Sequence, residues 1–432
     1  MQICNNIDIN GKGHLTFAGK DTLELAKKYG TPLYLMDEGK IREKMRTYKS
    51  AMERYFGEGS IPLFASKAAS FKQLYRIAKE EEMSIDVVSG GEIYTALAAG
   101  FDIANAFFHG NNKTIDEIAF AIENGIGCFV ADSLSELQLV NDEAARQGKK
   151  QNILLRITPG IDTHTNKKIA TGNVDSKFGM AIVTGQAVDF VKEAVKYENL
   201  NLIGYHCHVG SQVFDASTFI DAIDIMMDFA YDVKEKIGYV PEYMNLGGGF
   251  GVRYVASQAD IDIASTIREV GAALTQKCQE LGMDKPKILM EPGRSIVADA
   301  GMTLYTVGTV KKITNFKNYV AIDGGMTDNP RFALYDAEYT VMNAVKADAP
   351  KLYRCTIVGK CCESGDIIQE DVHIAKPEEG DILAVLTTGA YNYSMASNYN
   401  RIPRPPVVMI AGDKDYVAVK RETLEDIIRN DI

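Results

Sequence analysis

The chain has 432 residues, 46% apolar and 24% charged, and its 58 acidic and 47 basic side chains leave a formal net charge of −11. This acidic balance, without any block of lysines and arginines, argues against nucleic acid or an anionic membrane as a partner. No apolar run is long enough to cross a bilayer, and the first residues lack the pattern of a signal peptide. The seven cysteines show no CxxC or zinc-type spacing, so we expect free thiols in a cytoplasmic protein.

The first 38 residues come before any regular repeat of elements. They contain apolar clusters at 15–17 and 33–35, and the second cluster is typical of a strand. Between them, residues 21–30 predict a helix that begins at the capping residue Asp21 and stops at Gly30. A second helix is expected from about Glu38 to Phe56.

From residue 61 onward, short apolar runs alternate with amphipathic helical patterns at 71–82, 92–99, 114–124, 133–147 and 218–237. The eight runs predicted as strands end near Lys67, Ser89, His109, Ala131, Thr158, His208, Leu246 and Met290. Alternating strands and helices predict a parallel sheet, and eight strands are the number that closes a TIM-like (β/α)8 barrel. An open, doubly wound sheet is the alternative.

The pattern changes after about residue 299. Helical periodicity gives way to short β-rich runs at 303–312, 319–322, 353–358, 382–386 and 407–410, followed by one helix at 421–429. We therefore predict an α/β barrel at 39–298 and an all-β domain, a β-sandwich or β-barrel, at 299–432. Residues 1–38 are expected to join this β domain through their strand.

Polar residues follow the predicted barrel strands, where a (β/α)8 barrel carries its active site. They are Lys67, the segment 89–92, His109, Arg156, His206, His208, the glycines 247–249 and the segment 291–294. Lys67 ends the apolar run 61–68, and a lysine is costly to bury. It either emerges into solvent where the strand stops, or it is a reactive amine in a cleft that can form a Schiff base.

The segment Gly-Gly-Gly-Phe-Gly at 247–251 follows the seventh predicted strand. Its spacing differs from the dinucleotide fingerprint, and no clear helix opens after it. Glycines let backbone N–H groups surround an anion, and late barrel strands commonly carry phosphate sites, so a phosphate site is favoured over a merely flexible loop.

His206 and His208 lie on one face of the sixth predicted strand, because side chains alternate along a strand. Such a pair can bind a metal, which makes a metal-dependent hydrolase an alternative function. That reading needs further ligands, and the chain has six histidines, of which His14 and His373 lie outside the predicted barrel.

Two further motifs combine an acid with a second reactive group. Glu291 and Arg294 form either a local ion pair or a site in which the acid holds a pyridine nitrogen and the arginine binds a carboxylate. Cys362 is either a thiol in a turn or a proton donor, with Glu363 beside it as a clamp for a cationic group. The segments 328–335 and 389–393 carry arginine and tyrosines that are also typical of cores and interfaces.

Taken together and in order, these motifs resemble the alanine-racemase-like (fold type III) pyridoxal phosphate decarboxylases over nearly the whole chain. The motifs are FASKA at Lys67, HGNNK at His109, DSKFG at Asp175, HCHVGSQ at His206, GGGFG at Gly247, EPGR at Glu291, CESGD at Cys362 and GAY at Tyr391. The lysine segment, FASKAAS, departs from the family's usual YAxKAN. The register of Glu-Ser-Gly-Asp favours Cys362 over Cys361 as the family's cysteine.

The resemblance implies pyridoxal phosphate (PLP) as the cofactor and no metal. Lys67 would form the Schiff base, His208 would stack on the ring as a further catalytic residue, and Glu291 would pair with the pyridine nitrogen. The other residues implied to bind the cofactor are Ser211, Gly247, Gly248, Gly249, Gly293, Arg294 and Tyr391, with Ser211, the three consecutive glycines and Tyr391 at the phosphate.

The implied reaction is decarboxylation of meso-2,6-diaminopimelate to L-lysine and CO2, the last step of lysine biosynthesis. Ornithine, arginine or carboxynorspermidine are alternative substrates on the same fold. Cys362 would be the proton donor, Glu363 would hold the distal ammonium, and the distal end of the substrate would contact Arg294, Arg331, Tyr335 and Tyr391. The resemblance also implies a homodimer in which Cys362 and Glu363 reach across the interface. A PLP-free regulator on the same scaffold is the remaining alternative, and Lys67 with Cys362 argues against it.

Overall fold

The computed structural model describes residues 3–160 and 176–432, so Asp175 of the DSKFG motif lies outside the described residues. The chain divides into two compact units. The barrel unit comprises Lys44–Gly251 and Asp260–Gly293, and the sheet unit comprises Met1–Glu43, Val252–Ala259 and Arg294–Ile432.

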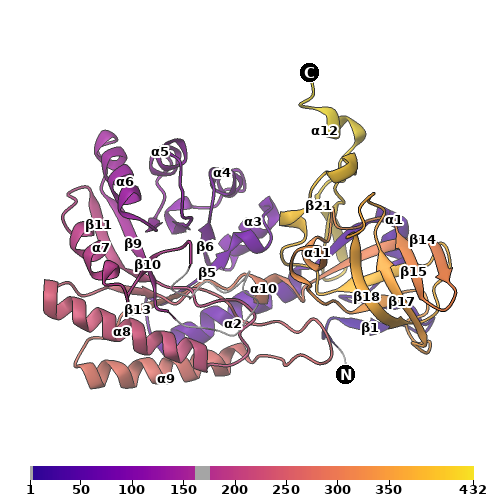
Figure 1. The fold of residues 1–432 in the computed structure, drawn as a ribbon, viewed down its shortest axis with the longest axis horizontal. Coiled ribbons are helices and arrows are strands. Elements are labelled where there is room, and N and C mark those ends of the chain that lie inside the picture. Colours follow the sequence, from indigo (N-terminus) through magenta and orange to yellow (C-terminus); the bar gives the residue numbers. More distant parts are fainter. Residues whose placement is uncertain (1–2, 161–175) are drawn as a thin grey trace. The chain divides into compact units, whose positions relative to one another are not determined.

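Parallel strands close the barrel unit into a ring. In chain order they are β5 (Ile61–Ala65), β6 (Ser84–Val87), β7 (Ala106–Phe108), β8 (Cys128–Ala131), β9 (Gln151–Thr158), β11 (Leu200–His206), β12 (Tyr243–Asn245) and β13 (Lys287–Met290). The hydrogen-bonded order is β9-β11-β12-β13-β5-β6-β7-β8, and β8 pairs again with β9. Figure 1 labels β5, β6, β9, β11 and β13 of this ring, with helices of the barrel unit around them. This closure confirms the predicted (β/α)8 barrel and excludes the open sheet. A short strand, β10 (Met180–Ala181), pairs with the end of β9 outside the ring.

Helices follow the barrel strands, and successive helices from α3 to α9 contact one another in chain order. They are α3 (Lys72–Glu80), α4 (Gly90–Ala98), α5 (Ile115–Glu123), α6 (Leu134–Arg146), α7 (Gln186–Ala194), α8 (Ser217–Ile237) and α9 (Ile263–Leu281). Several begin at a hydroxyl cap, because a side-chain oxygen satisfies an N–H that the first turn leaves without a partner. Ser89 caps α4, Ser133 caps α6, and Thr114 forms a full capping box with Glu117 at α5.

The barrel interior is a packed apolar core. It contains Leu63, Phe107, Val130, Leu154 and Leu289, together with Cys128, all of them buried. Since a filled barrel leaves no channel, polar side chains that need a cavity must lie where the strands end.

The sheet unit contains a nine-stranded sheet with the order β18-β17-β15-β14-β4-β20-β21, and β19 pairs with both β14 and β16. Its strands are β4 (Leu33–Asp37), β14 (Gly301–Ile313), β15 (Lys317–Ile322), β16 (Val341–Asn343), β17 (Tyr353–Val358), β18 (Ile367–Ile374), β19 (Ile382–Leu386), β20 (Val407–Ala411) and β21 (Lys414–Val419). The N-terminal strand β4 lies between β14 and β20, which confirms that the N-terminal segment joins the β-rich part of the chain.

A three-stranded sheet and a helix cover part of the large sheet. The elements are β1 (Ile7–Ile9), β2 (Leu15–Phe17), β3 (Lys20–Asp21) and α1 (Thr22–Tyr29), and α2 (Glu38–Phe56) follows β4. Phe17 and Leu25 pack in one buried cluster with Leu35, Leu304 and Val408. This cluster forms the core of the sheet unit.

Three short helices complete the sheet unit: α10 (Arg294–Val297), α11 (Arg331–Tyr335) and α12 (Leu424–Ile428). The last is shorter than the predicted 421–429, because Thr423 and Asp426 form a capping box that fixes its first turn. Among the helices of residues 3–160 and 176–432, none combines the length and the apolar character that crossing a membrane requires.

Candidate active site

Lys67 lies in a short 3-10 turn, Ser66–Ala68, directly after β5. The strand that was predicted to end near Lys67 thus stops at Ala65, and Lys67 follows it. The buried Ser66 hydroxyl explains the turn, because its Oγ is 2.7 Å from the Asp86 carbonyl oxygen and 2.9 Å from Glu92 Oε2. Glu92 also accepts the Val88 N–H at 2.8 Å. The turn that carries Lys67 is thus tied to the end of β6.

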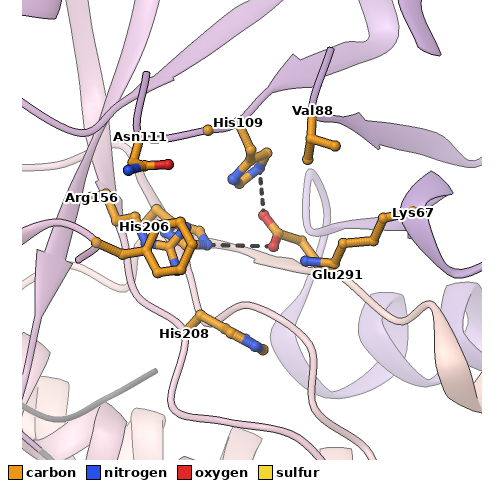
Figure 2. Close-up of a pocket in the computed structure, with 10 residues that line it drawn as sticks. Lys67, Val88, His109, Asn111, Arg156, His206, His208 and Glu291 are labelled. Carbon is orange, nitrogen blue, oxygen red and sulfur yellow. Dashed lines mark hydrogen bonds and ion pairs between the residues drawn. The ribbon is translucent and has the colours of Figure 1, made fainter. Parts of the chain in front are cut away.

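A cavity of about 350 Å³ lies at the carboxyl ends of the barrel strands. Figure 2 shows the Lys67 side chain extending toward the side of this cavity on which Glu291 lies. The predicted clustering of polar residues after the strands is confirmed for six of them. The lining residues are Lys67, Val88, His109, Gly110, Asn111, Arg156, Phe178, His206, His208 and Glu291.

Glu291 is a buried carboxylate at which three side chains converge. His109 Nε2 lies 2.9 Å from Oε1 and His206 Nε2 lies 3.4 Å from Oε2 (dashed in Figure 2), and Asn245 Nδ2 donates to Oε1 at 2.6 Å. Burial raises the pKa of Glu291, but the two histidines outweigh it and hold this pKa well below its usual value. Glu291 is therefore an anion at the base of the cavity, which suits a protonated ring nitrogen.

The two histidines of the predicted pair, His206 and His208, both line the cavity. Burial lowers the pKa of His206 to about 4, so this imidazole is neutral. Burial and the charge of Lys67 lower the pKa of His208 well below its usual value. The donor atoms of His109, His206 and Glu291 lie within 4.8 Å of one another, which is close enough for a metal. The contacts of both imidazoles with the carboxylate also account for this proximity.

The glycine segment after β12 packs too closely for side chains. A Cβ on Gly247 would lie 2.6 Å from His208 Nδ1, one on Gly248 would lie 2.2 Å from the Glu291 carbonyl oxygen, and one on Gly249 would lie 2.4 Å from the Gly210 carbonyl oxygen. The Gly247 N–H already donates to Asn245 Oδ1 at 2.9 Å. The predicted phosphate contacts of this segment would therefore come from Gly248 and Gly249.

Gly293, which follows Glu291 by two residues, is equally crowded. A Cβ there would lie 2.9 Å from Ala65 Cβ and 3.0 Å from the Ala65 carbonyl oxygen. A glycine suits position 293 because its backbone passes close to the end of β5 and the turn that carries Lys67. Ser211, also predicted to bind the phosphate, is half-buried beyond the end of β11.

Arg156 and Asp86 line or approach the cavity without a role assigned from the sequence. The Arg156 guanidinium stacks over the Phe178 ring at 4.2 Å, and its Nε lies 3.9 Å from Asp132 Oδ1. Asp86 is buried, and neither of its carboxylate oxygens has a hydrogen-bond partner among the described residues. Burial raises the pKa of Asp86, and Oδ1 lies 4.0 Å from His109 Nε2.

The sheet unit contains a second cluster of predicted site residues, which we call the arginine cluster: Tyr254, Arg294, Arg331 and Tyr391. Arg294 Nη1 donates to the Tyr254 hydroxyl at 2.9 Å, and the Arg331 guanidinium lies over the Tyr254 ring at 4.9 Å. Burial raises the pKa of Tyr254, but the two guanidinium groups outweigh it and lower this pKa overall. Two guanidinium groups lie beside one phenol here, an arrangement that suits an anionic group.

Arg331 is buried, and its Nη1 donates to the Tyr339 hydroxyl at 2.7 Å. No carboxylate of the described residues forms an ion pair with it. Arg294 lies over the Tyr391 ring at 4.7 Å, and Tyr391 has a φ of +62°, a conformation that is strained for a residue with a side chain. Tyr335 is half-buried on α11, one turn from Arg331 and therefore on the same helix face.

Cys362 and Glu363 are exposed on a loop of the sheet unit. The Cys362 N–H donates to Asn400 Oδ1 at 2.8 Å. The loop is also held by Asp366, whose carboxylate accepts the N–H groups of Cys361 at 2.7 Å and Met326 at 2.6 Å. The aspartate of the CESGD motif thus fixes the backbone that carries the predicted proton donor.

Sequence reasoning missed Asp86, Asn245 and Tyr254. The first two could have been found, because each is a polar residue inside a short apolar strand, where burial without a role is costly. Tyr254 gave no such signal, since it lies in an irregular segment after the glycines.

Comparisons with known proteins agree with this geometry. A family model described as the pyridoxal binding domain of pyridoxal-dependent decarboxylases matches residues 38–298. Diaminopimelate decarboxylase of Halalkalibacterium halodurans is 45% identical over 424 residues, which cover 98% of this chain and 96% of that relative. The Bacillus subtilis diaminopimelate decarboxylase is 44% identical over 423 residues, with the same two shares.

Solved structures of the same kind match 95% or more of this chain. Diaminopimelate decarboxylase from M. jannaschii in complex with L-lysine has a TM-score of 0.91 at 36% identity, covering 100% of this chain and 99% of that one. The Helicobacter pylori enzyme complexed with L-lysine has a TM-score of 0.85 at 32% identity, covering 95% and 98%. The chain therefore belongs to the pyridoxal-dependent decarboxylases and, within them, to the diaminopimelate decarboxylase family.

Proposed function

We propose that the chain removes one carboxylate from meso-2,6-diaminopimelate, giving L-lysine and CO2, with PLP as cofactor. The observation that carries the substrate is the arginine cluster. Arg331 is buried with phenol partners and no carboxylate among the described residues, and such a cation calls for an anionic ligand. The names of the relatives and the two L-lysine complexes support the same substrate and product.

The barrel unit fits PLP. Glu291 is an anion suited to a pyridinium, the closely packed glycine segment presents backbone without side chains, and Lys67 supplies an amine at the cavity. When bound, the cofactor accepts the electron pair that CO2 leaves behind. We assign covalent attachment to Lys67, contact with the ring to His208, and the phosphate to Ser211, Gly248 and Gly249, with Tyr391.

The sheet unit would supply specificity and the returning proton. Arg294, Arg331 and Tyr335 would bind the distal carboxylate, and Glu363 the distal ammonium. Cys362 Sγ would give its proton to the substrate Cα once CO2 has left. Charge pairs at the far end discriminate well, because an analogue without those charges leaves the protein's own groups unpaired.

We further propose a homodimer in which Cys362 and Glu363 complete the partner's site. Both side chains are exposed on the single chain, which supports a role at an interface. All seven cysteines are free thiols, which supports a reducing, cytoplasmic setting.

A CO2-release assay over basic and diamino acids, with and without added PLP, tests this function. We expect kcat/KM for meso-diaminopimelate to exceed that for ornithine, arginine and carboxynorspermidine by at least about a thousandfold, since unpaired buried charges are strongly rejected. Chromatography should identify L-lysine as the product. Equal turnover of ornithine would contradict the carboxylate-binding role of the arginine cluster.

Gly248→Ala is expected to weaken PLP binding by about tenfold or more, since relieving a 2.2 Å contact must displace the glycine segment or Glu291. The dissociation constant can be measured by titrating apo-protein with PLP and following visible absorbance. Gly11→Ala is the matched control, because a Cβ on Gly11 would meet nothing within 4 Å. If both variants bind PLP like the parent, Gly248 is not part of the phosphate site.

A further inference from the structure

His109 and His206 are buried polar residues to which the proposed mechanism gives no role. His109 follows β7 and His206 ends β11, so the barrel brings them together from positions about a hundred residues apart. Their rings meet edge-on with centroids 4.9 Å apart. Both Nε2 atoms face the carboxylate of Glu291, at 2.9 Å and 3.4 Å (Figure 2).

We propose that His109 and His206 are positioning residues that hold the Glu291 carboxylate ionised and directed at the ring nitrogen of the cofactor. The proposal rests on the cofactor and is independent of which amino acid the enzyme decarboxylates.

The hydrogen-bonding capacity of the carboxylate supports this role. An ionised carboxylate only accepts hydrogen bonds and has about four acceptor positions on its two oxygens. The His109, His206 and Asn245 side chains occupy three directions around Glu291. His206 and Asn245 donate hydrogen bonds to the carboxylate, whereas His109 Nε2 is in ion-pair contact at 2.9 Å without making a hydrogen bond. The carboxylate therefore keeps acceptor capacity for a donor from the cavity, where a pyridinium N–H would be held.

The chemical type of the donors supports it as well. His206 must present Nε2–H to a group that only accepts, and its Nδ1 is buried without a hydrogen-bond partner among the described residues, so nothing competes for the other tautomer. A neutral donor orients the carboxylate without cancelling its charge. An arginine or lysine in the same place would neutralise Glu291 and weaken its attraction for a pyridinium.

Two other charged groups near this network, Arg156 and Asp86, are engaged elsewhere or more distant. Arg156 stacks on Phe178 and lies near Asp132, and Asp86 lies 4.0 Å from His109 Nε2. Glu291 is thus the carboxylate nearest to the His109 Nε2 atom.

The test compares glutamine and asparagine at each histidine. Glutamine places an amide N–H near the position of Nε2, whereas the shorter asparagine places it near Nδ1 and cannot reach Glu291. We expect His206→Asn and His109→Asn to weaken PLP binding by about tenfold, the effect of losing one hydrogen bond to a charged group. The glutamine variants should stay within about threefold of the parent.

Dissociation constants are measured by absorbance titration of apo-protein with PLP, in the absence of substrate, alongside the melting temperature of each variant. His373→Asn, an exposed histidine on β18, is the matched control and should bind PLP like the parent. Equal PLP affinity of asparagine and glutamine variants, whether both strong or both weak, would overturn the proposal. If the substrate assignment is wrong, the CO2-release assay over basic and diamino acids will show it. The dissociation constants for PLP would then be unchanged.

Discussion

Lys67→Ala is expected to abolish the covalent attachment of PLP and to lower CO2 release by at least about a thousandfold, since the covalent step loses its amine. Lys67 is the one lysine among the described residues that line the barrel cavity, and its turn is fixed by the buried Ser66 hydroxyl. The readout is the visible absorbance of the lysine–cofactor linkage in purified protein, together with CO2 release from meso-diaminopimelate.

Lys72→Ala is the control for this substitution. Lys72 is exposed at the start of α3, five residues further along, so its loss removes the same charge from the same region. It should leave both the absorbance and the activity unchanged. A visible absorbance band that survives in Lys67→Ala would mean that another lysine carries the cofactor, and borohydride reduction followed by peptide mapping would identify it.

The barrel could be predicted because its strands produce a clear apolar pattern in the sequence. Strands of a parallel barrel are buried on both faces, so they read as short apolar runs between helical periods. After residue 299, the strands missed from the sequence were β16, β18 and β21. β18 reads IIQEDVHI, with consecutive charged residues, and β21 is an edge strand with half-exposed and exposed side chains. A local apolar pattern does not reveal strands such as β18 and β21, which are defined by their hydrogen-bonded pairing and not by burial.

The barrel-mouth residues could be predicted for a related reason. Lys67, His109, Arg156, His206 and Glu291 all come directly after or at the end of a strand, and ring closure gathers such positions at one cavity. Chain order alone was enough to expect this. Which residues contact which was not predictable, because it depends on side-chain directions around the ring.

Contacts between residues of the sheet unit were harder to predict from the sequence. Tyr254, Arg294 and Arg331 are separated by about forty residues each and come from irregular segments or short helices. The sequence left a local ion pair open for Glu291 and Arg294. In the structure the carboxylate faces His109 and His206, and the guanidinium donates to the Tyr254 hydroxyl. The roles of these residues in binding and catalysis stay predictions.

Arg331→Leu is expected to lower kcat/KM for meso-diaminopimelate by about a hundredfold to a thousandfold, corresponding to about 3–4 kcal/mol for a carboxylate left without its buried partner. Leucine keeps apolar bulk at this buried position, so the loss is mainly that of the guanidinium. Ornithine has no distal carboxylate, so its slow turnover should change little. The variant should therefore discriminate far less between the two substrates than the parent does.

Arg354→Leu provides the control, because Arg354 is an exposed arginine of the same unit whose guanidinium pairs with Asp371 at 3.0 Å. It should leave both kcat/KM values unchanged, as exposed ion pairs contribute little. The melting temperature of Arg331→Leu must be measured too, because the substitution removes the bond to the Tyr339 hydroxyl. Equal loss on both substrates would mean that Arg331 supports the fold of the sheet unit and does not select the substrate, whereas a loss confined to meso-diaminopimelate can arise only from an interaction that ornithine never makes.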